Sequence, residues 1–526
     1  MTGKRDFVRG AAILSISGLL VKLLGAALRI PLTNKLGDGM AYYNVAYSIY
    51  SIFLVLSTAG TPVAISRLVS ERMAVGNLHS AHRVFSTAVK LMWAIGIASF
   101  SICFFGAEFI AEIIEIPEAA LSLRAIAPAL CIVPLLSAFR GYFQGQQNML
   151  PTAASEISEQ VVRVAVGLTL SFMLFDQGLP MAAAGATFGA AAGAAAGIVV
   201  MLAIYWFHRK KNRPREKKDD REPTGFILKK IVWIAVPIII GAEIMPIMST
   251  IDTSLIVSRL QATGWEYADA LNLYSQYGSY CDTLISLPQT FTQAIGVSLV
   301  PSIAAFFWQK KMDKVRENMR ISMRLTMIMA CPCAVGLFAL AEPILLLLYP
   351  QQAESALAAA SILRVMTAGI VLLAISQTLT GALQSINRQI TPVKNLAIGA
   401  CIKAGLTYML VGLPVVNVKG AAIGTNAAYL TALLLNLFAL KKRTGVRFPV
   451  LQTFVKPAAA ALLMGIWVRA VCTIAAGSVG IRMAAVISIF AGILMYVVLI
   501  VRLKVISGAE LRSLPCGAFL AKVFRV

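Results

Sequence analysis

The sequence predicts an all-α, polytopic membrane protein of about fourteen transmembrane helices, with two pseudo-symmetric six-helix lobes plus two C-terminal helices. Three observations predict this class. Of the 526 residues, 58% are hydrophobic and 13% are charged, whereas a soluble domain carries roughly a quarter charged residues. Apolar runs of about 18 to 25 residues recur along the chain, each long enough to cross a bilayer. An internal repeat relates the first half of the chain to the second.

The expected spans follow one another with short connections, and no stretch between them is long enough to fold as a soluble domain. Basic residues precede the first span, as in a signal peptide. That span is about twenty residues long and lacks a convincing cleavage site, so we expect it to be a membrane helix. The spans cover residues 10–31, 41–66, 86–107, 119–140, 155–175, 181–207, 228–251, 277–307, 321–341, 356–385, 395–413, 420–440, 453–475 and 482–502.

The positive charge of the chain is concentrated in alternate loops. The formal net charge is +23, which in a soluble protein would suggest nucleic acid. Here most Lys and Arg residues fall in every second loop, and one of the opposite loops is acidic between Glu108 and Glu118. This asymmetry follows the positive-inside rule and predicts cytoplasmic N- and C-termini in a bacterial plasma membrane. We expect the basic loops to attract membrane lipids and expect no nucleic acid as a partner.

One hydrophilic segment divides the chain. The run from His208 to Glu222 is rich in Lys, Arg and Asp, and we expect a solvated linker there, not a binding motif. It defines four expected parts: the N-terminal six-helix lobe, the basic cytoplasmic linker, the C-terminal six-helix lobe, and helices thirteen and fourteen with a cytoplasmic tail. These parts cover residues 1–207, 208–226, 227–440 and 441–526.

Short motifs repeat on the two sides of the linker. Gly141 and Gln144 recur 240 residues later as Gly381 and Gln384. Further matches at similar separations join Pro151 with Pro392, Gly178-Leu179-Pro180 with Gly412-Leu413-Pro414, Gly185 and Gly189 with Gly420 and Gly424, and Pro62 with Pro301. An even number of helices gives both halves the same orientation, so the repeat is parallel. Two such bundles around a central cavity suit alternating access, a symmetry that a membrane scaffold does not need.

Ionisable residues within the expected spans are the candidate functional residues, because charge in hydrocarbon is expensive. The candidate substrate-binding residues, expected to line the cavity, are Lys22, Arg29, Arg163 and Lys403, of which Arg163 and Lys403 are repeat mates. The candidate ion-coupling residues are Glu243, Asp252 and Asp282. Cations in a low-dielectric cleft would attract a diphosphate. The alternatives are that Lys22 pairs with Glu243, and that Arg163 and Lys403 cap backbone carbonyls.

The sequence contains no pattern typical of an enzyme. It has no Walker A loop and no nucleophile elbow, and its three histidines do not form a metal set. Cys331-Pro332-Cys333 could bind a soft metal, but a metal pump would need a soluble ATPase domain for which the chain has no room. The eight cysteines show no paired spacing of a disulfide framework. We therefore expect no catalytic residues, no metal and no cofactor.

Two motifs resemble those of a known family. One is Ile30-Pro31-Leu32-Thr33 after Gly25, followed by STAGTPVAISRLVSE from Ser57 to Glu71. The other, Leu287-Pro288 with GVSLVPSI from Gly296 to Ile303, is similar to its second-half counterpart. Over essentially its whole length the chain resembles the polysaccharide biosynthesis family of Gram-positive bacteria, which includes stage V sporulation protein B and the Bacillus-type lipid II flippases.

The resemblance implies membership of the multidrug/oligosaccharidyl-lipid/polysaccharide exporter superfamily, whose members have two six-helix lobes in a V around a central cavity. It also implies that spans 453–475 and 482–502 hold a polyprenyl chain beside the second lobe. The sequence departs from the proteobacterial lipid II flippases at two places. Only Arg29 lies near their Arg-Asp pair late in helix one, and Thr283 follows Asp282 where they carry an arginine.

Together these features predict a flippase that moves an undecaprenyl-diphosphate-linked saccharide, such as lipid II or a related cell-wall or polysaccharide precursor, to the outer leaflet. In the absence of a nucleotide site, the membrane potential or an ion gradient would drive it. Two alternatives stay open: a drug/cation antiporter of the same superfamily, which the basic residues disfavour, and a non-transporting membrane assembly factor. Cell-wall synthesis proteins are candidate partners, and the sequence leaves open a vegetative or a sporulation role.

Overall fold

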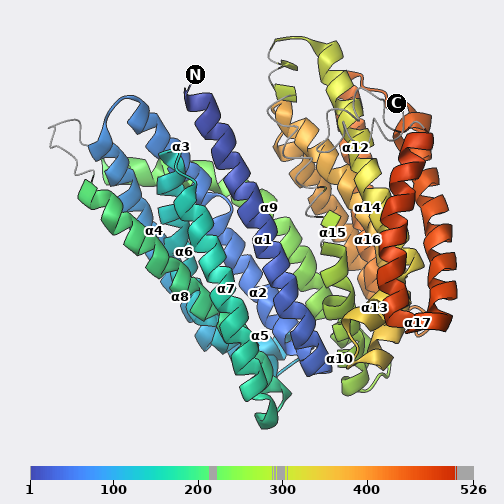
Figure 1. Ribbon diagram of the computed structural model, residues 1–526. Helices are drawn as coiled ribbons and strands as arrows, with labels where there is room; N and C mark the ends of the chain where they lie inside the picture. The colour runs from blue at the N-terminus through green and yellow to red at the C-terminus, as the bar shows by residue number, and fades with distance from the viewer. Residues whose placement is uncertain are drawn as a thin grey trace. The chain divides into compact units, whose positions relative to one another are not determined.

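The computed structural model describes residues 2–211, 222–286, 288–289, 292, 303–304, 306–307, 309–503 and 505. Every regular element within these ranges is a helix (Figure 1). The chain divides into two compact units, Met1–Ser279 and Tyr280–Val526, and each is described by itself. The predicted all-α class is confirmed. The expected division into lobes at the linker, most of which lies outside the described ranges, stays a prediction.

Unit 1 contains ten α-helices among its described residues. They are α1 (Thr2–Leu36), α2 (Met40–Thr58), α3 (Thr61–Ala74), α4 (Leu78–Phe105), α5 (Ala107–Ile113), α6 (Ala119–Gly145), α7 (Leu150–Met173), α8 (Leu179–Lys211), α9 (Thr224–Ala262) and α10 (Tyr267–Ser275). Short 3-10 helices lie at η1 (Gly37–Gly39) and η2 (Phe175–Gln177). A π-helix, η3 (Gln276–Cys281), follows α10 and crosses into unit 2.

Unit 2 continues with further helices. They are α12 (Met312–Ala339), α13 (Ala341–Leu348), α14 (Ala353–Ser385), α15 (Ile390–Val411), α16 (Lys419–Thr444), the π-helix η4 (Leu451–Val455) and α17 (Lys456–Arg502). Within α17 the backbone is non-helical at Gly480, where φ is 79°. Only glycine adopts this conformation readily, and it separates the two spans expected at 453–475 and 482–502.

The structure confirms a polytopic membrane protein. Nine segments of the described residues are long and apolar enough to cross a membrane, and the two longest, Ser17–Ala74 and Leu451–Arg502, each contain more than one helix. The expected spans coincide with helices in the described residues; the span 277–307 is described only in part, and Pro301 lies outside the described residues.

The expected span 41–66 is not one continuous helix. It is interrupted between Thr58, where α2 ends, and Thr61, where α3 begins. A Cβ atom at Gly60 would collide with the Ala235 carbonyl of α9, and Pro62 occupies the first turn of α3. Proline is favoured there because it needs no backbone donor. The break therefore lets the α2–α3 junction pack directly on the backbone of α9.

Glycine spacing sets the packing of α7 on α8 in unit 1. Gly185, Gly189, Gly193 and Gly197 recur at every fourth position of α8, which gives the helix one face of small residues. A Cβ atom at Gly193 would lie 2.5 Å from the Glu159 carbonyl oxygen. The backbones of α7 and α8 therefore approach as closely as only glycine allows.

The same helix pairing recurs in unit 2. A Cβ atom at Gly189 would lie 2.7 Å from the Arg163 carbonyl oxygen of α7, and one at Gly424 of α16 would lie 3.2 Å from the Lys403 carbonyl oxygen of α15. These pairs are the repeat mates expected from the sequence. The internal repeat is therefore confirmed in the helix packing of both units.

An ion pair is also repeated. In unit 1, Arg124 of α6 binds Glu108 of the short helix α5 at 2.8 Å, and in unit 2, Arg364 of α14 binds Glu342 of the short helix α13 at 2.6 Å. Each pair fastens a short helix to the long helix that follows it. Because all four side chains are partly exposed, each pair contributes little stability.

In unit 2, α17 compensates for a proline within α12. Pro332 lacks a backbone donor, so the carbonyl of Ile328, four residues earlier, has no helical partner. The Tyr496 hydroxyl of α17 donates a hydrogen bond of 2.8 Å to that carbonyl, and Tyr496 is buried. The contact joins α17 to the main body of unit 2.

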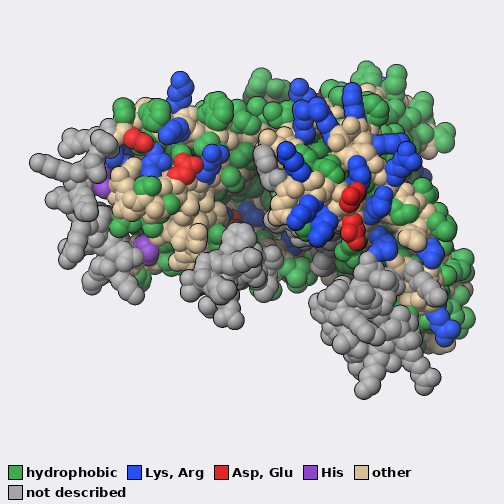
Figure 2. All heavy atoms as spheres, turned by 90° about the horizontal axis from the view of Figure 1, so that it is seen from above, with side chains coloured by type: hydrophobic (Ala, Val, Ile, Leu, Met, Phe, Trp, Pro, Cys, Tyr) green, Lys and Arg blue, Asp and Glu red, His purple; other side chains and the backbone are tan. Residues whose placement is uncertain are grey.

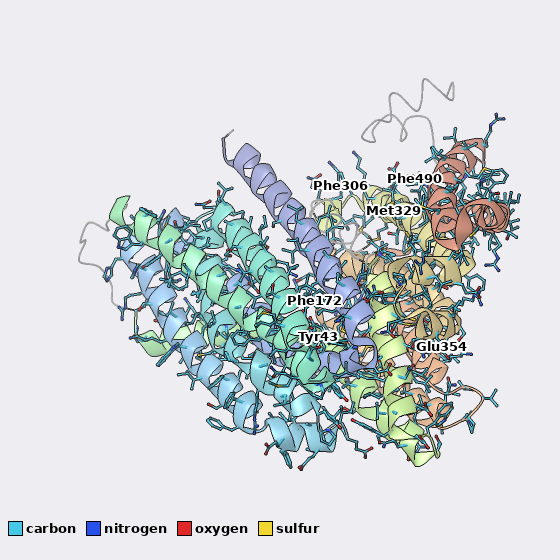
Figure 3. All side chains as sticks on the ribbon, turned by 60° about the horizontal axis from the view of Figure 1, so that its bottom comes forward. Tyr43, Phe172, Phe306, Met329, Glu354 and Phe490 are labelled. Atoms are coloured by element: carbon cyan, nitrogen blue, oxygen red, sulfur yellow. The ribbon has the colours of Figure 1, made fainter. Side chains whose placement is uncertain are left out.

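We expect Tyr496→Phe to lower the free energy of unfolding by about 1 kcal/mol, because it leaves the Ile328 carbonyl without a donor. The thermal midpoint of the detergent-solubilised protein measures this loss. Phe490→Leu is the control, because Phe490 lies on the same helix and is 65% exposed (Figure 3). Equal midpoints for Tyr496→Phe and the wild type would contradict the compensation.

Basic side chains gather at one end of the helices of unit 2. Arg316 and Arg320, at the start of α12, donate hydrogen bonds of 2.8 Å to the carbonyls of Thr444 and Arg447, at and beyond the end of α16. Figure 2 shows Lys and Arg side chains gathered on the face formed by these helix ends. This segregation is what the positive-inside pattern predicts. The side of the membrane that the face occupies stays a prediction.

Candidate anion-binding site

Two arginines of unit 1 converge on one tyrosine. Arg29 lies in the last two turns of α1, Arg163 lies in the middle of α7, and these two helices pack together. The Arg29 guanidinium is 6.0 Å from the ring centre of Tyr43 on α2. The charges of both arginines act on the Tyr43 hydroxyl. Tyr43 is labelled in Figure 3.

Tyr43 belongs to a row of three tyrosines on α2. Tyr43 and Tyr47 stack with ring centres 5.8 Å apart, and Tyr47 and Tyr50 follow at 5.7 Å with tilted rings. Residues at this spacing share one face of a helix, and we call these three the tyrosine face. Arg163 interacts electrostatically with each of them.

The Arg163 side chain is incompletely satisfied. Its Nε is buried and has no hydrogen-bond partner in the part of the chain that the structure describes. Glu159, one turn earlier on α7, is the carboxylate that acts on it, but Glu159 already binds Arg140 of α6 at 2.9 Å. A buried N–H of a guanidinium without an acceptor is costly, so an incoming anion would find a donor there.

A hydrogen-bonded relay connects Arg29 to the π-helix η3. The Arg29 guanidinium donates to Oδ1 of Asn44 at 2.8 Å, and Nδ2 of Asn44 donates to the Ser279 hydroxyl at 2.7 Å. Gly278 makes room for this amide, since a Cβ atom there would lie 3.0 Å from Nδ2. Wide π-helical turns recur at functional sites because they re-aim side chains. Here the π-helical turn places Ser279 within hydrogen-bond distance of Asn44, the residue that orients Arg29.

The four basic residues predicted from the sequence lie in different surroundings. Arg29 lies over the ring of Tyr43, and Arg163 acts most strongly on Tyr47 and Tyr50 of the same tyrosine face. Lys22 is exposed on α1, seven residues before Arg29, and so lies on the same side of that helix. Lys403 is only 2% exposed on α15 of unit 2. Lys22 makes no contact with Tyr43 among the described residues, and the cavity-lining role of all four stays a prediction.

The three predicted acids also differ. Both carboxylate oxygens of Glu243 on α9 are buried and have no hydrogen-bond partner among the described residues, so its suggested pairing with Lys22 does not occur. Asp252, near the C-terminal end of α9, is buried and accepts a hydrogen bond of 2.8 Å from the Tyr277 hydroxyl of η3. Asp282 is exposed in unit 2. The ion-coupling role of all three stays a prediction.

Sequence reasoning missed the tyrosine face and the charges around Glu159. The spacing of the tyrosines, four and then three residues apart, indicates that they share one face of a helix, and it can be seen in the sequence. Glu156 and Glu159 were another, since both fall within the expected span 155–175, where charge is expensive. Arg140 lies at the edge of the expected span 119–140, and only the structure shows that it binds Glu159.

These residues together can hold an anion with several oxygens. Each guanidinium offers a planar fork that matches phosphate oxygens, and the tyrosine hydroxyls add neutral donors. The site lies between helices, where a low dielectric strengthens each interaction. The described residues of this cluster include no group of acids, histidines and cysteines that could hold a metal ion.

Comparison with known proteins identifies the family. The model of the family described as polysaccharide biosynthesis protein matches residues 7–307, more than half of the chain. The chain belongs to the polysaccharide biosynthesis protein family. A second model, described as MatE, matches residues 277–409. Both candidate arginines of this family member fall within the first match.

Two curated relatives of this polysaccharide biosynthesis family protein cover most of its length. The lipid II flippase MurJ of Bacillus subtilis is 28% identical over 466 residues, which are 84% of each chain. Stage V sporulation protein B of the same organism is 26% identical, over 97% of this chain and 98% of the relative. The solved structure of the lipid II flippase MurJ in its inward closed conformation superposes with a TM-score of 0.67 at 17% identity, over 92% of this chain and 97% of that one. These findings place the chain in the superfamily predicted from its motifs and confirm its fold.

Proposed function

We propose that this protein is a flippase that carries an undecaprenyl-diphosphate-linked saccharide from the cytoplasmic to the outer leaflet. The substrate class comes from its relative, the lipid II flippase MurJ. The observation that carries the proposal is the convergence of Arg29 and Arg163 on Tyr43 within the interior of unit 1. Paired guanidiniums with tyrosine hydroxyls suit a diphosphate, the part of such a lipid that every saccharide variant shares.

The remaining parts of the proposal follow the sequence. The head group binds the arginines from the cytoplasm while the polyprenyl tail stays in lipid beside the two helices of α17, and the termini are cytoplasmic. Translocation proceeds by alternating access, the mechanism that a parallel repeat favours. It involves no bond-breaking step, and an ion gradient or the membrane potential drives it. Glu243 is the acid best suited to bind the coupling ion, because no other described residue satisfies its carboxylate.

A translocation assay tests this proposal. The purified protein is reconstituted into liposomes that contain labelled lipid II, undecaprenyl diphosphate or another undecaprenyl-linked saccharide, and the label reaching the outer leaflet is measured. We expect movement of at least one diphosphate-linked lipid, and none of a neutral polyprenol. Transport of none of these lipids by a correctly folded protein would overturn the proposal.

A drug/cation antiporter is the second candidate, because the MatE model matches residues 277–409. Cationic drugs need acids at the binding site, whereas the cluster at Tyr43 presents two arginines. The same liposomes loaded with a fluorescent cation distinguish the two activities. Extrusion of the cation without lipid movement would favour the antiporter, and the absence of both would favour a non-transporting assembly factor.

A further inference from the structure

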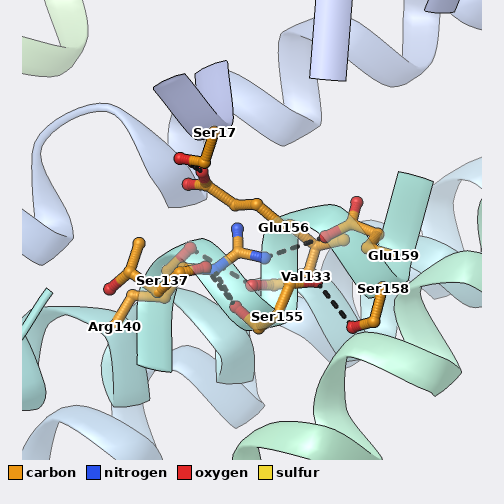
Figure 4. Close-up of polar contacts among 9 residues, drawn as sticks. Ser17, Val133, Ser137, Arg140, Ser155, Glu156, Ser158 and Glu159 are labelled. Carbon is orange, nitrogen blue, oxygen red and sulfur yellow. Dashed lines mark hydrogen bonds and ion pairs between the residues drawn. The ribbon is translucent and has the colours of Figure 1, made fainter. Parts of the chain in front are cut away.

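A buried network of charges lies on α7 beside the arginine site. Arg140 of α6 donates from Nε to the Ser155 hydroxyl at 3.1 Å and binds Glu159 at 2.9 Å. Glu156 lies three residues before Glu159, on the same face of α7, and accepts a hydrogen bond of 3.4 Å from the Ser17 hydroxyl of α1. Figure 4 shows Arg140 between its two partners, with Glu156 reaching away toward Ser17.

The pairing within this network is unequal. The Arg140 guanidinium interacts with two carboxylates. It forms a direct ion pair with Glu159, and its charge acts on Glu156 without direct contact. The charges that act on Glu156 are those of Arg140 and Glu159, which oppose each other. Within the described residues, the hydrogen bond that Glu156 accepts is the long one from Ser17. A half-buried carboxylate in this position, beside a like charge, is suited to take up a proton.

The repeat shows that the fold does not need these acids. At the equivalent positions of α15, Leu396 and Gly399 stand in place of Glu156 and Glu159. The close helix contact persists there, because a Cβ atom at Gly399 would lie 2.6 Å from the Ala428 carbonyl oxygen of α16. Lys403, the mate of Arg163, is retained. The second half thus keeps the cation and the packing without the carboxylates.

We propose that Glu156 is a proton-binding site linked to the anion site through Glu159 and Arg163. The link rests on the proposed function. A diphosphate bound to Arg163 would cancel part of the positive charge that Glu159 faces. A proton on Glu156 would then remove one negative charge from the same group of side chains. Lipid and proton therefore bind together, so acidification strengthens lipid binding.

The charges that act on Glu156 are those of Arg140 on α6 and Glu159 on α7. Glu159 in turn acts on Arg163 of α7, which interacts with the tyrosine face of α2. The helix α1, which carries Ser17, bears Lys22, Arg29 and Lys35 among its described side chains. The α8 residues that face this part of α7 are Gly193 and Gly197, which do not titrate. Glu156 is the one carboxylate here without a direct guanidinium contact in the described structure.

The sign of the linkage is testable with undecaprenyl diphosphate as the probe. Since a proton favours anion binding, we expect wild-type affinity to fall as pH rises, by up to about tenfold per pH unit beyond the effect of the ionisation of the lipid itself. Glu156→Gln should remove this excess dependence and leave only that of the lipid. Glu108→Gln, in the exposed ion pair with Arg124, is the matched control and should titrate like the wild type.

Infrared difference spectra of the detergent-solubilised protein, recorded against pH, test the proton site without any lipid. We expect the carbonyl band of a protonated carboxyl group to appear on acidification and to be missing in Glu156→Gln. If that band persists in Glu156→Gln but is lost in Glu243→Gln, the proposal is overturned and the site belongs to α9. If the band titrates as expected but the lipid binds at no pH, the proton site stands while the proposed function fails.

Discussion

Replacing Arg163 with glutamine is expected to slow lipid translocation about a hundredfold, the equivalent of about 2.7 kcal/mol. Arg163 supplies one of the two guanidiniums at the tyrosine face, and its buried Nε has no acceptor within the described structure. Losing a buried, charge-assisted contact costs several kcal/mol. The substitution leaves no carboxylate without a partner, because Glu159 keeps its ion pair with Arg140. Initial rates in the liposome assay measure the effect.

Two variants make the Arg163 result interpretable. Arg163→Lys keeps the charge but not the planar fork, and we expect a smaller loss of about tenfold. Arg124→Gln removes an arginine whose ion pair is exposed, and its rate should match the wild type. If a folded Arg163→Gln protein translocated lipid at the wild-type rate, Arg163 would not be part of the binding site.

Adding a single methyl group at Gly193 is expected to destabilise the protein by about 1 to 3 kcal/mol. In Gly193→Ala the new Cβ lies 2.5 Å from the Glu159 carbonyl oxygen and 3.0 Å from Cβ of Arg163. Because the first neighbour is backbone, α7 and α8 must move apart, and Arg163 moves with them. We therefore expect a lower thermal midpoint and slower lipid translocation.

Gly405→Ala is the matched control for this substitution. Gly405 is also a glycine within a membrane helix, but a Cβ atom there meets nothing within 4 Å. Alanine has the higher helix propensity, so Gly405→Ala should leave the midpoint unchanged or raise it slightly. Similar midpoints for the two variants would show that the α7–α8 contact is looser than the structure indicates.

The sequence predicted the helices and the repeat more completely than the site. The apolar runs located the helices, except for the break before Pro62. Each run must be helical because backbone groups in lipid can form hydrogen bonds only within the segment. Repeated residues such as Gly189 and Gly424 then located equivalent helix contacts. Arg29 and Arg163 stood out because isolated charges in apolar spans are expensive.

The partners of these arginines could not be predicted in the same way. Asn44 and Ser279 are 235 residues apart, and no local pattern joins them. Before His208, the helix α8 is almost entirely apolar or small on all sides, and for such helices the hydrophobic pattern does not say which face meets which neighbour. Glu156 was overlooked because its significance lies in sharing Arg140 with Glu159, a relation that exists only in space.

The sequence by itself determined that this protein crosses a membrane many times, in two related halves, because hydrocarbon imposes length, composition and helical structure on every span. Only the tertiary structure decided which charges meet. The rotation of each helix about its axis, set by contacts such as that of Gly193 with Glu159, turned Arg163 toward the tyrosine face and left Glu156 without a guanidinium of its own. Electrostatic interactions fall off with distance, so these placements decide which residues can act together.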